Sequence, residues 1–220
     1  RVCGMIPFGR IGGRVGAYAE AAAVDPSWLA PLPDSVGFEE GSTLPLNVLT
    51  AHQGLANFDL APGSRLLVTG ASGGVGGFVV ELALCAGLHV IAVAGRDDEA
   101  WVRSLGAHEV LPRDADLTGL DTVDGVYDAV PVGPDRFLPA LREGGTAVFT
   151  RAPQPATSPH HRFETVRVQS DAATLAEMAR LLGEGALHTR VSRVLPLRDA
   201  AEAHRLVEAG GLRGKVVLRG

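Results

Sequence analysis

The chain has 220 residues, of which 46% are hydrophobic and 20% charged, and its formal net charge is -5 at pH 7. This composition is typical of a globular protein with a proper core and argues against disorder. The negative charge and the lack of any segment that concentrates Lys and Arg argue against a general nucleic-acid-binding function. No apolar run reaches the roughly 18 residues that a membrane span needs.

The first residues, Arg1 to Gly4, show no signal-peptide pattern, and the expected location is cytoplasmic. The two cysteines, Cys3 and Cys85, are far apart in sequence. We expect both to be buried small hydrophobes rather than a disulfide or a metal-binding pair.

The first 32 residues are rich in Gly and Pro, with strand-like pieces at 16–21 and 28–30. They are expected to form the end of an all-β unit. Trp28, Trp101 and Met178 are expected in the core.

Between residues 65 and 151, short apolar runs alternate with amphipathic stretches. Strands are predicted at 66–69, 89–94, 110–111, 126–130 and 146–150. Helices are predicted at 75–86, from an Asp97 cap to Gly106, and from Pro134 to Gly144. Apolar strands alternating with helices indicate a parallel sheet covered on both faces, which is a doubly wound α/β (Rossmann) fold.

The C-terminal part begins after an irregular stretch at 153–161, which we expect to be a loop. Asp171 is predicted to cap a helix that runs through Leu182. A strand at 191–197, a helix at 199–208 and a strand at 215–218 are predicted to follow.

A glycine-rich segment joins the strand at 66–69 to the next helix, and it reads V-T-G-A-S-G-G-V-G from Val68 to Gly76. Gly73 and Gly76 match the second and third glycines of G-x-G-x-x-G, and Ala71 replaces the first. The second glycine lets the backbone approach a pyrophosphate, and the third lets helix and strand pack closely. Because the motif follows a strand and opens a helix, it predicts a dinucleotide site rather than a turn without ligand.

The end of the strand at 89–94 selects the dinucleotide. NAD-dependent enzymes usually place an acidic residue there for the ribose 2′-hydroxyl, whereas this chain has Gly95 followed by Arg96. A guanidinium suits a 2′-phosphate, so NADPH is favoured over NADH. Asp97 and Asp98 follow directly, and the alternative is that they pair with Arg96 at a plain helix start.

Several further motifs occur in order along the chain. They are R-V-C-G at 1–4, G-A-Y-A-E at 16–20, L-P-L-N-V-L-T-A at 44–51, A-S-G-G-V-G at 71–76, S-L-G-A at 104–107 and G-K-V-V-L at 214–218. With these motifs the chain resembles the medium-chain dehydrogenase/reductase superfamily, specifically its zinc-free quinone oxidoreductase branch.

The resemblance implies two domains. Residues 1–32 and 185–220 would be the remainder of a β-rich, GroES-like substrate domain, and residues 33–184 the dinucleotide-binding Rossmann domain. Roughly 80 or more residues of the substrate domain are expected to precede Arg1, judged from ordinary domain sizes.

The resemblance also implies that no metal is bound. Zinc-dependent relatives have a four-cysteine lobe where residues 4–20 contain no cysteine, and they carry a cysteine ligand at the position of Leu46. Leucine cannot coordinate zinc. The histidines show no ligand spacing.

By the same resemblance, the cofactor is NADPH and the reaction is hydride transfer to a quinone or an α,β-unsaturated carbonyl. Thr50 and Asn47 are expected near the nicotinamide, and Ser72, Gly73, Gly74, Val75 and Gly76 at the pyrophosphate. Thr50 could instead bond back within its helix. Tyr18 could be a proton donor and Lys215 could reach the cofactor, but a structural role is favoured for both, and no motif assigns the proton donor.

Relatives of this kind commonly pair through the edge of the nucleotide-binding sheet, so a homodimer is expected. Two other functions stay open. One is an enoyl-thioester reductase of polyketide or fatty-acid assembly, although no basic patch for a carrier protein is evident. The other is a non-catalytic dinucleotide-binding module.

Overall fold

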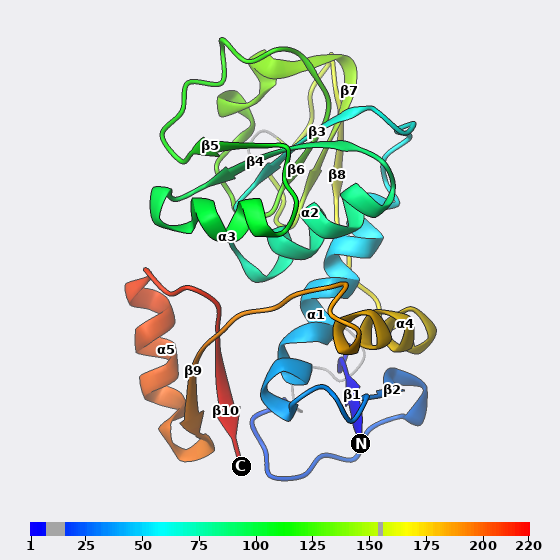
Figure 1. Ribbon diagram of the computed structural model, residues 1–220, viewed down its shortest axis with the longest axis vertical. Coiled ribbons are helices and arrows are strands. Elements are labelled where there is room, and N and C mark those ends of the chain that lie inside the picture. Colours follow the sequence, from blue (N-terminus) through cyan, green and yellow to red (C-terminus); the bar gives the residue numbers. More distant parts are fainter. Residues whose placement is uncertain (8–15, 154–155) are drawn as a thin grey trace. The chain divides into compact units, whose positions relative to one another are not determined.

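The computed structural model describes residues 1–7, 16–153 and 156–220, which form two compact units. The central unit is Thr50–Arg167, and the terminal unit combines Arg1–Leu49 with Val168–Gly220. Helix α1 (Phe38–Leu55) contains the point at which the chain passes from the terminal unit to the central unit (Figure 1).

The central unit is built on a six-stranded parallel sheet. In spatial order its strands are β5 (Glu109–Pro112), β4 (His89–Ala94), β3 (Arg65–Thr69), β6 (Val123–Asp128), β7 (Leu141–Phe149) and β8 (Arg162–Thr165). The strand of this sheet that comes first along the chain, β3, therefore lies in the middle, and the order reverses between β3 and β6. This is the strand order of a doubly wound dinucleotide-binding fold, so the predicted fold class is confirmed.

The central strands are buried on both faces, as the unbroken apolar runs predicted. Leu67, Ile91, Val126 and Ala147 are fully buried and belong to one core cluster. Helix α2 (Gly74–Cys85) packs against β3 and β4, and α3 (Glu99–Ser104) packs against β4 and β5.

The predicted helix from Pro134 to Gly144 is wrong. Two short 3-10 helices, η3 (Pro134–Arg136) and η4 (Leu138–Ala140), lead directly into β7 at Leu141. Pro139 explains the difference, because it lacks an N–H donor and its ring clashes with the preceding helical turn. Phe137 is fully buried all the same, so the apolar pattern located the core correctly.

The start of the helix after β4 also differs from the prediction. Arg96–Asp98 form a 3-10 helix, η2, and the cap residue of α3 is Asp98, whose side chain makes no capping hydrogen bond. Asp97 is therefore not the cap.

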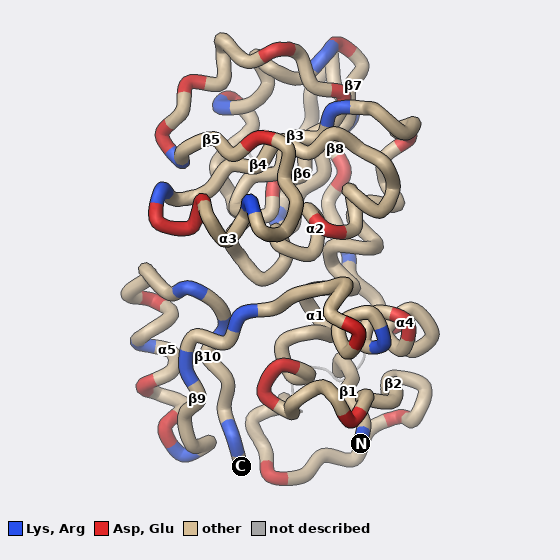
Figure 2. Tube along the Cα trace, viewed as in Figure 1, with Lys and Arg blue, Asp and Glu red and all other residues tan. Residues whose placement is uncertain are grey.

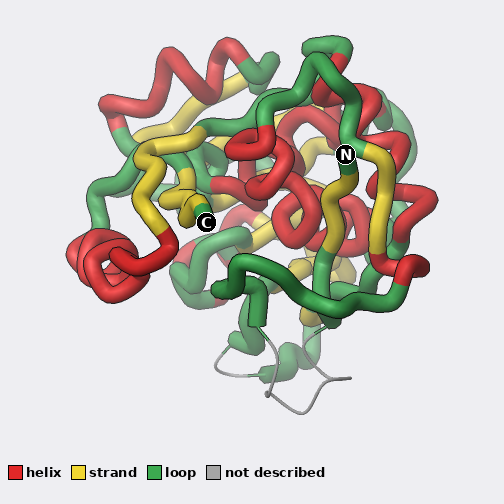
Figure 3. Tube along the Cα trace, turned by 90° about the horizontal axis from the view of Figure 1, so that it is seen from below, coloured by secondary structure: helices red, strands yellow, loops and turns green. Residues whose placement is uncertain are grey.

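The terminal unit contains two small sheets. Strand β1 (Val2–Gly4) pairs antiparallel with β2 (Leu29–Pro31), which follows the 3-10 helix η1 (Pro26–Trp28) (Figure 3). Strand β9 (Val191–Pro196) pairs parallel with β10 (Lys215–Arg219). Between β9 and β10 lie the short helix η5 (Leu197–Asp199) and α5 (Ala200–Ala209), so the predicted order of the C-terminal elements is confirmed.

The predicted strand at 16–21 is wrong, because those residues form exposed bends with no strand partner among the described residues. Alternating small residues fit a strand pattern, but a strand also needs a neighbour to pair with and a face to bury. The described part of 153–161 contains no helix or strand, as expected of a loop.

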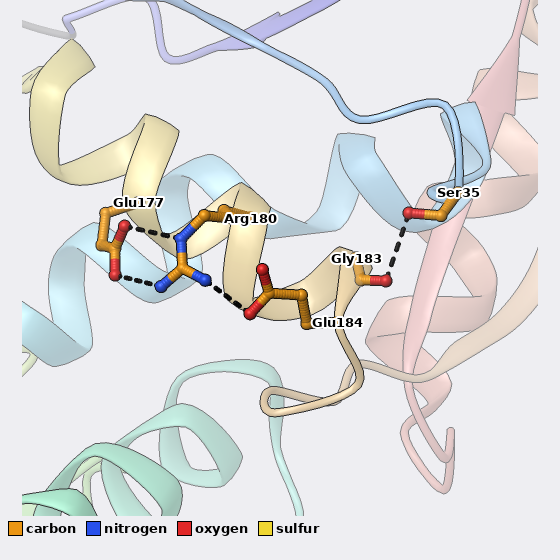
Figure 4. A network of polar contacts seen from close by, with 5 residues as sticks. All are labelled: Ser35, Glu177, Arg180, Gly183 and Glu184. Atoms are coloured by element: carbon orange, nitrogen blue, oxygen red, sulfur yellow. Dashed lines mark hydrogen bonds and ion pairs between the residues drawn. The ribbon is translucent and has the colours of Figure 1, made fainter.

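Helix α4 (Ala172–Gly183) begins as predicted, since the Asp171 carboxylate accepts hydrogen bonds from the Thr174 amide at 3.0 Å and the Thr174 hydroxyl at 2.6 Å. On its surface Arg180 pairs with Glu177 and Glu184 (Figure 4). The Ser35 hydroxyl donates to the carbonyl of Gly183 at 3.2 Å (Figure 4).

Helix α4 also packs against β2, which places it with the terminal unit. The compact units change at 49/50 and 167/168, whereas the predicted domain boundaries lie at 32/33 and 184/185.

Of five residues that were expected to be buried, two are buried and three are not. Met178 is buried, but Trp28 and Trp101 are half-buried. Cys3 is buried, whereas Cys85 is exposed near the end of α2; both cysteines are free. The apolar character of α2 did not reveal that its last residue is exposed to solvent.

Candidate nucleotide-binding site

The glycine loop connects the end of β3 to the start of α2. Gly70 has a φ of +62°, a conformation that favours glycine, and Gly73 is the residue that caps α2. Because Gly73 has no side chain, no cap side chain accepts a hydrogen bond from the first amides of α2. The first N–H groups of a helix lack intrahelical acceptors, so the amides of Gly74, Val75 and Gly76 are suited to bind an anion.

Close backbone approach explains why two of the glycines are needed. A Cβ atom on Gly76 would lie 2.2 Å from the carbonyl oxygen of Gly70, a distance that no side chain tolerates. A Cβ on Gly73 would lie 3.2 Å from the same oxygen. Gly73 is exposed, and Ser72, Gly74 and Val75 are half-buried, so this part of the loop is accessible. The bare, accessible backbone fits the pyrophosphate of a dinucleotide.

A buried carboxyl group links the carboxyl ends of β6 and β3, next to the glycine loop. Asp128, the last residue of β6, is 3% exposed and accepts a short hydrogen bond from the Thr69 hydroxyl at the end of β3. Burial raises the pKa of Asp128, although hydrogen bonds from Thr69, Val132 and Val130 oppose the increase. The residues after Asp128 thereby stay next to the glycine loop, where a Cβ on Gly70 would meet Val130.

Sequence reasoning missed Thr69 and Asp128. The signal was present: a Thr and an Asp end two predicted strands that neighbour each other at the point where the strand order reverses. In open α/β sheets this is where ligands bind.

Arg96 lies at the carboxyl end of β4, where it was expected. Its Nη2 atom is 3.8 Å from Oδ2 of Asp114, and both side chains are about three-quarters exposed, at 77% and 76%. An exposed pair at this distance is weak, so a phosphate could displace it. Basic and acidic residues alternate along the chain in this region (Figure 2).

Thr50 and Asn47 both belong to α1, but they fall in different compact units. Thr50 is buried, and its carbonyl accepts a hydrogen bond from the hydroxyl of Tyr127 on β6 at 2.7 Å. Burial raises the pKa of Tyr127, so the phenol stays a hydrogen-bond donor. Gly54 makes room for this ring, since a Cβ there would lie 2.2 Å from the Tyr127 hydroxyl.

Asn47 lies on the part of α1 that belongs to the terminal unit. Its Nδ2 atom donates to the carbonyl of Thr43 at 2.5 Å, and the side chain is almost fully buried. The structure thus brings Ser72 to Gly76, Arg96 and Thr50 into one unit, and it places Asn47 in the other.

The terminal unit has a cavity of its own, of about 460 Å³. Its lining includes the side chains of Tyr18, Leu46, Asn47, His204 and Lys215. The Tyr18 and His204 rings meet edge to face at 5.8 Å, and burial lowers the pKa of Lys215. A mainly apolar cavity with a few polar groups is typical of a small-molecule site. Sequence reasoning did not single out His204.

Neither a metal centre nor a membrane span is found within the ranges that the structure describes. No group of three or more His, Cys, Asp or Glu side chains there could hold a metal ion. Likewise, none of the described helices is long and apolar enough to cross a membrane.

Comparison with known proteins matches residues 105–218 to the family described as zinc-binding dehydrogenase. A quinone-oxidoreductase homolog, chloroplastic, of Spinacia oleracea is 32% identical over 92% of this chain and 68% of its own length. An NADPH-dependent alkenal/one oxidoreductase, chloroplastic, of Arabidopsis thaliana is 30% identical over 92% of this chain and 53% of its own.

Among solved structures, the quinone oxidoreductase from Coxiella burnetii superposes with a TM-score of 0.79 at 29% identity. The match covers 89% of this chain and 65% of that chain. The chain therefore spans about two thirds of the quinone oxidoreductases that it matches. With the strand order and the glycine loop, these matches show that the chain belongs to the zinc-binding dehydrogenase family, in the quinone oxidoreductase branch of the medium-chain dehydrogenase/reductase superfamily.

Proposed function

We propose that the chain carries the cofactor-binding part of an NADPH-dependent oxidoreductase that reduces a quinone or an α,β-unsaturated carbonyl without zinc. The observation that carries this proposal is the close approach of the glycine loop to α2, since a Cβ on Gly76 would lie 2.2 Å from the Gly70 carbonyl oxygen. The first amides of α2 have no acceptor within their own helix, which suits them to an anion. The names of the related oxidoreductases support the substrate class.

In this proposal, different residues bind different parts of the dinucleotide. Amides from Ser72 to Gly76 would hold the pyrophosphate, with the helix dipole of α2 favouring its negative charge. Arg96 would contact the 2′-phosphate. Thr50 and Asn47 would lie toward the nicotinamide, which supplies the hydride when it is bound.

The class of acceptor follows from the residues that could polarise it. Leu46 replaces a zinc ligand, so a simple ketone would lack a Lewis acid. In a quinone or an enone, conjugation moves the charge of the added hydride onto oxygen, where hydrogen-bond donors can stabilise it. We place the acceptor in the cavity of the terminal unit, whose polar side chains include Asn47 and Lys215.

The test is NADPH oxidation, followed by absorbance, with four acceptors: a quinone, a 2-alkenal, an enoyl thioester and a saturated ketone. We expect turnover of the quinone or the alkenal, little with the ketone, and no loss of activity after treatment with a metal chelator. Turnover of the enoyl thioester alone would instead support the alternative role in polyketide or fatty-acid assembly. If NADPH binds but no acceptor is reduced, the chain acts as a non-catalytic binding module.

We also propose a homodimer that forms through β8, one of the two edge strands of the six-stranded sheet. Light scattering of the purified chain tests this, and a monomer at all concentrations would contradict it. A cytoplasmic location stays a prediction, since the two plant relatives are chloroplastic proteins.

A further inference from the structure

We propose that Arg113, which sequence reasoning did not consider, is the residue that selects NADPH over NADH, with Arg96 as its partner. This inference rests on the proposed nucleotide site. It names the side chain that recognises the 2′-phosphate.

The register of the sheet brings Arg113 to the correct place. Strands β4 and β5 run parallel, with Ala94 opposite Pro112 at their carboxyl ends. Gly95 and Arg113 are the next residues on each strand, so they leave the sheet side by side. The end of β4 is where the adenine ribose lies in folds of this type.

Distances around Gly95 show which groups face the ribose position. A Cβ on Gly95 would lie 3.7 Å from Nη2 of Arg113 and 3.9 Å from Oδ2 of Asp98. Glycine leaves this space open, and it is flanked by one cation and one anion. The guanidinium suits a 2′-phosphate, whereas the carboxylate suits the hydroxyls of an unphosphorylated ribose.

The interactions that each charged side chain already makes indicate which of them is most available to a phosphate. Arg113 forms no ion pair with any residue in the described part of the chain, so no acidic side chain has to be displaced before it binds phosphate. Arg96 has to give up Asp114, and Asp98 already takes part in another interaction. The backbone of Arg113 is held in place, because the Arg136 guanidinium donates a hydrogen bond to its carbonyl. Arg113 is therefore the guanidinium most available to a phosphate.

The test compares 2′-AMP with 5′-AMP, and NADPH with NADH, by calorimetric titration of the whole chain. We expect Arg113→Met to weaken 2′-AMP and NADPH binding roughly 10- to 100-fold, the range for a charge-assisted hydrogen bond, and to leave 5′-AMP and NADH unchanged. Arg96→Met should have a smaller effect in the same direction. Asp98→Asn should strengthen NADPH binding, because it removes a negative charge beside the phosphate.

Arg103→Met is the matched control, since Arg103 is an exposed arginine on α3 that pairs with Glu99. It should change none of these affinities. Equal NADPH affinity in Arg113→Met and the original chain would overturn the inference and leave the proposed function standing. A preference of the original chain for NADH would overturn it too, in favour of Asp98. Failure of the original chain to bind either dinucleotide would contradict the proposed function itself.

Discussion

Gly76 is the residue at which a single methyl group should have the largest effect on the cofactor site. A Cβ there would lie 2.2 Å from the Gly70 carbonyl oxygen, so Gly76→Ala must move the glycine loop away from α2. We expect a loss of NADPH binding of at least tenfold, with an overpacking cost of about 1–3 kcal/mol in unfolding free energy. Calorimetric titration and urea unfolding measure the two effects.

Gly77→Ala is the control for that substitution. It lies in the same helical turn, but its Cβ would come no closer than 3.4 Å to Leu105. We expect NADPH affinity within twofold of the original chain. If both substitutions weaken NADPH binding equally, then close backbone approach is not the reason that the motif needs a glycine at position 76.

Asp128 predicts a dependence of stability on pH. Burial raises its pKa in the folded chain, so folding favours the protonated form and stability falls as pH rises through the interval above the unfolded value of about 3.9. Asp128→Asn removes this titration, and its unfolding free energy should fall less steeply across that interval. Urea unfolding at a series of pH values measures the slopes, and parallel slopes for the two proteins would contradict the assignment.

Residue types predicted the glycine loop because the requirement is local: a turn, a close approach and a helix start all lie within nine residues, from Val68 to Gly76. Asp128 and Arg113 could not be recognised in the same way. Their roles depend on the register between neighbouring strands, which places Asp128 opposite Thr69 and Arg113 beside Gly95.

Among the elements, α1 is tied to the sheet of the central unit by one buried hydrogen bond. The Tyr127 hydroxyl donates to the carbonyl of Thr50 at 2.7 Å. Tyr127→Phe should lower the unfolding free energy by about 0.5–1.5 kcal/mol, the net value of such a bond. Urea unfolding measures this, with Tyr18→Phe as control, because Tyr18 is 60% exposed and should change stability by less than about 0.5 kcal/mol. Equal effects would show that the buried bond contributes nothing.

The cap of α4 gives a second element-scale prediction. Asp171→Ala removes the hydrogen bonds to Thr174 and should cost about 1 kcal/mol of unfolding free energy. Asp199 occupies the corresponding position of α5 but makes no side-chain capping bond, so Asp199→Ala should cost much less. Thermal unfolding of both variants checks this prediction. An equal loss of stability in the two variants would mean that the capping hydrogen bonds of Asp171 do not stabilise α4.

The elements that were predicted correctly from the sequence are those with a strong local signal. Strand β4 was predicted at its observed bounds, and the Asp171 cap located the start of α4. The helix predicted at 134–144 failed because apolar spacing outweighed Pro139. The strand predicted at 16–21 failed because pairing partners are set by the tertiary structure and not by the residues of the strand.

For the whole molecule, composition and strand–helix alternation were enough to predict the doubly wound sheet, since each strand had to be apolar on both faces. They did not predict where the compact units change, because that depends on α4 packing against β2, which lies more than a hundred residues earlier in the chain. The proposed cofactor site therefore follows from local sequence, whereas the proposed acceptor site depends on a cavity of the terminal unit that only the folded chain forms.

We propose above that the glycine loop between β3 and α2 binds the pyrophosphate of NADPH. The most direct measurement is a titration of the isotope-labelled chain with NADPH, followed by the NMR shifts of its backbone amides. The account predicts saturable shifts that are largest from Ser72 to Gly76, with further changes near Gly95 that NADH does not reproduce. Largest shifts outside the central unit, or no shifts at saturating NADPH, would contradict it.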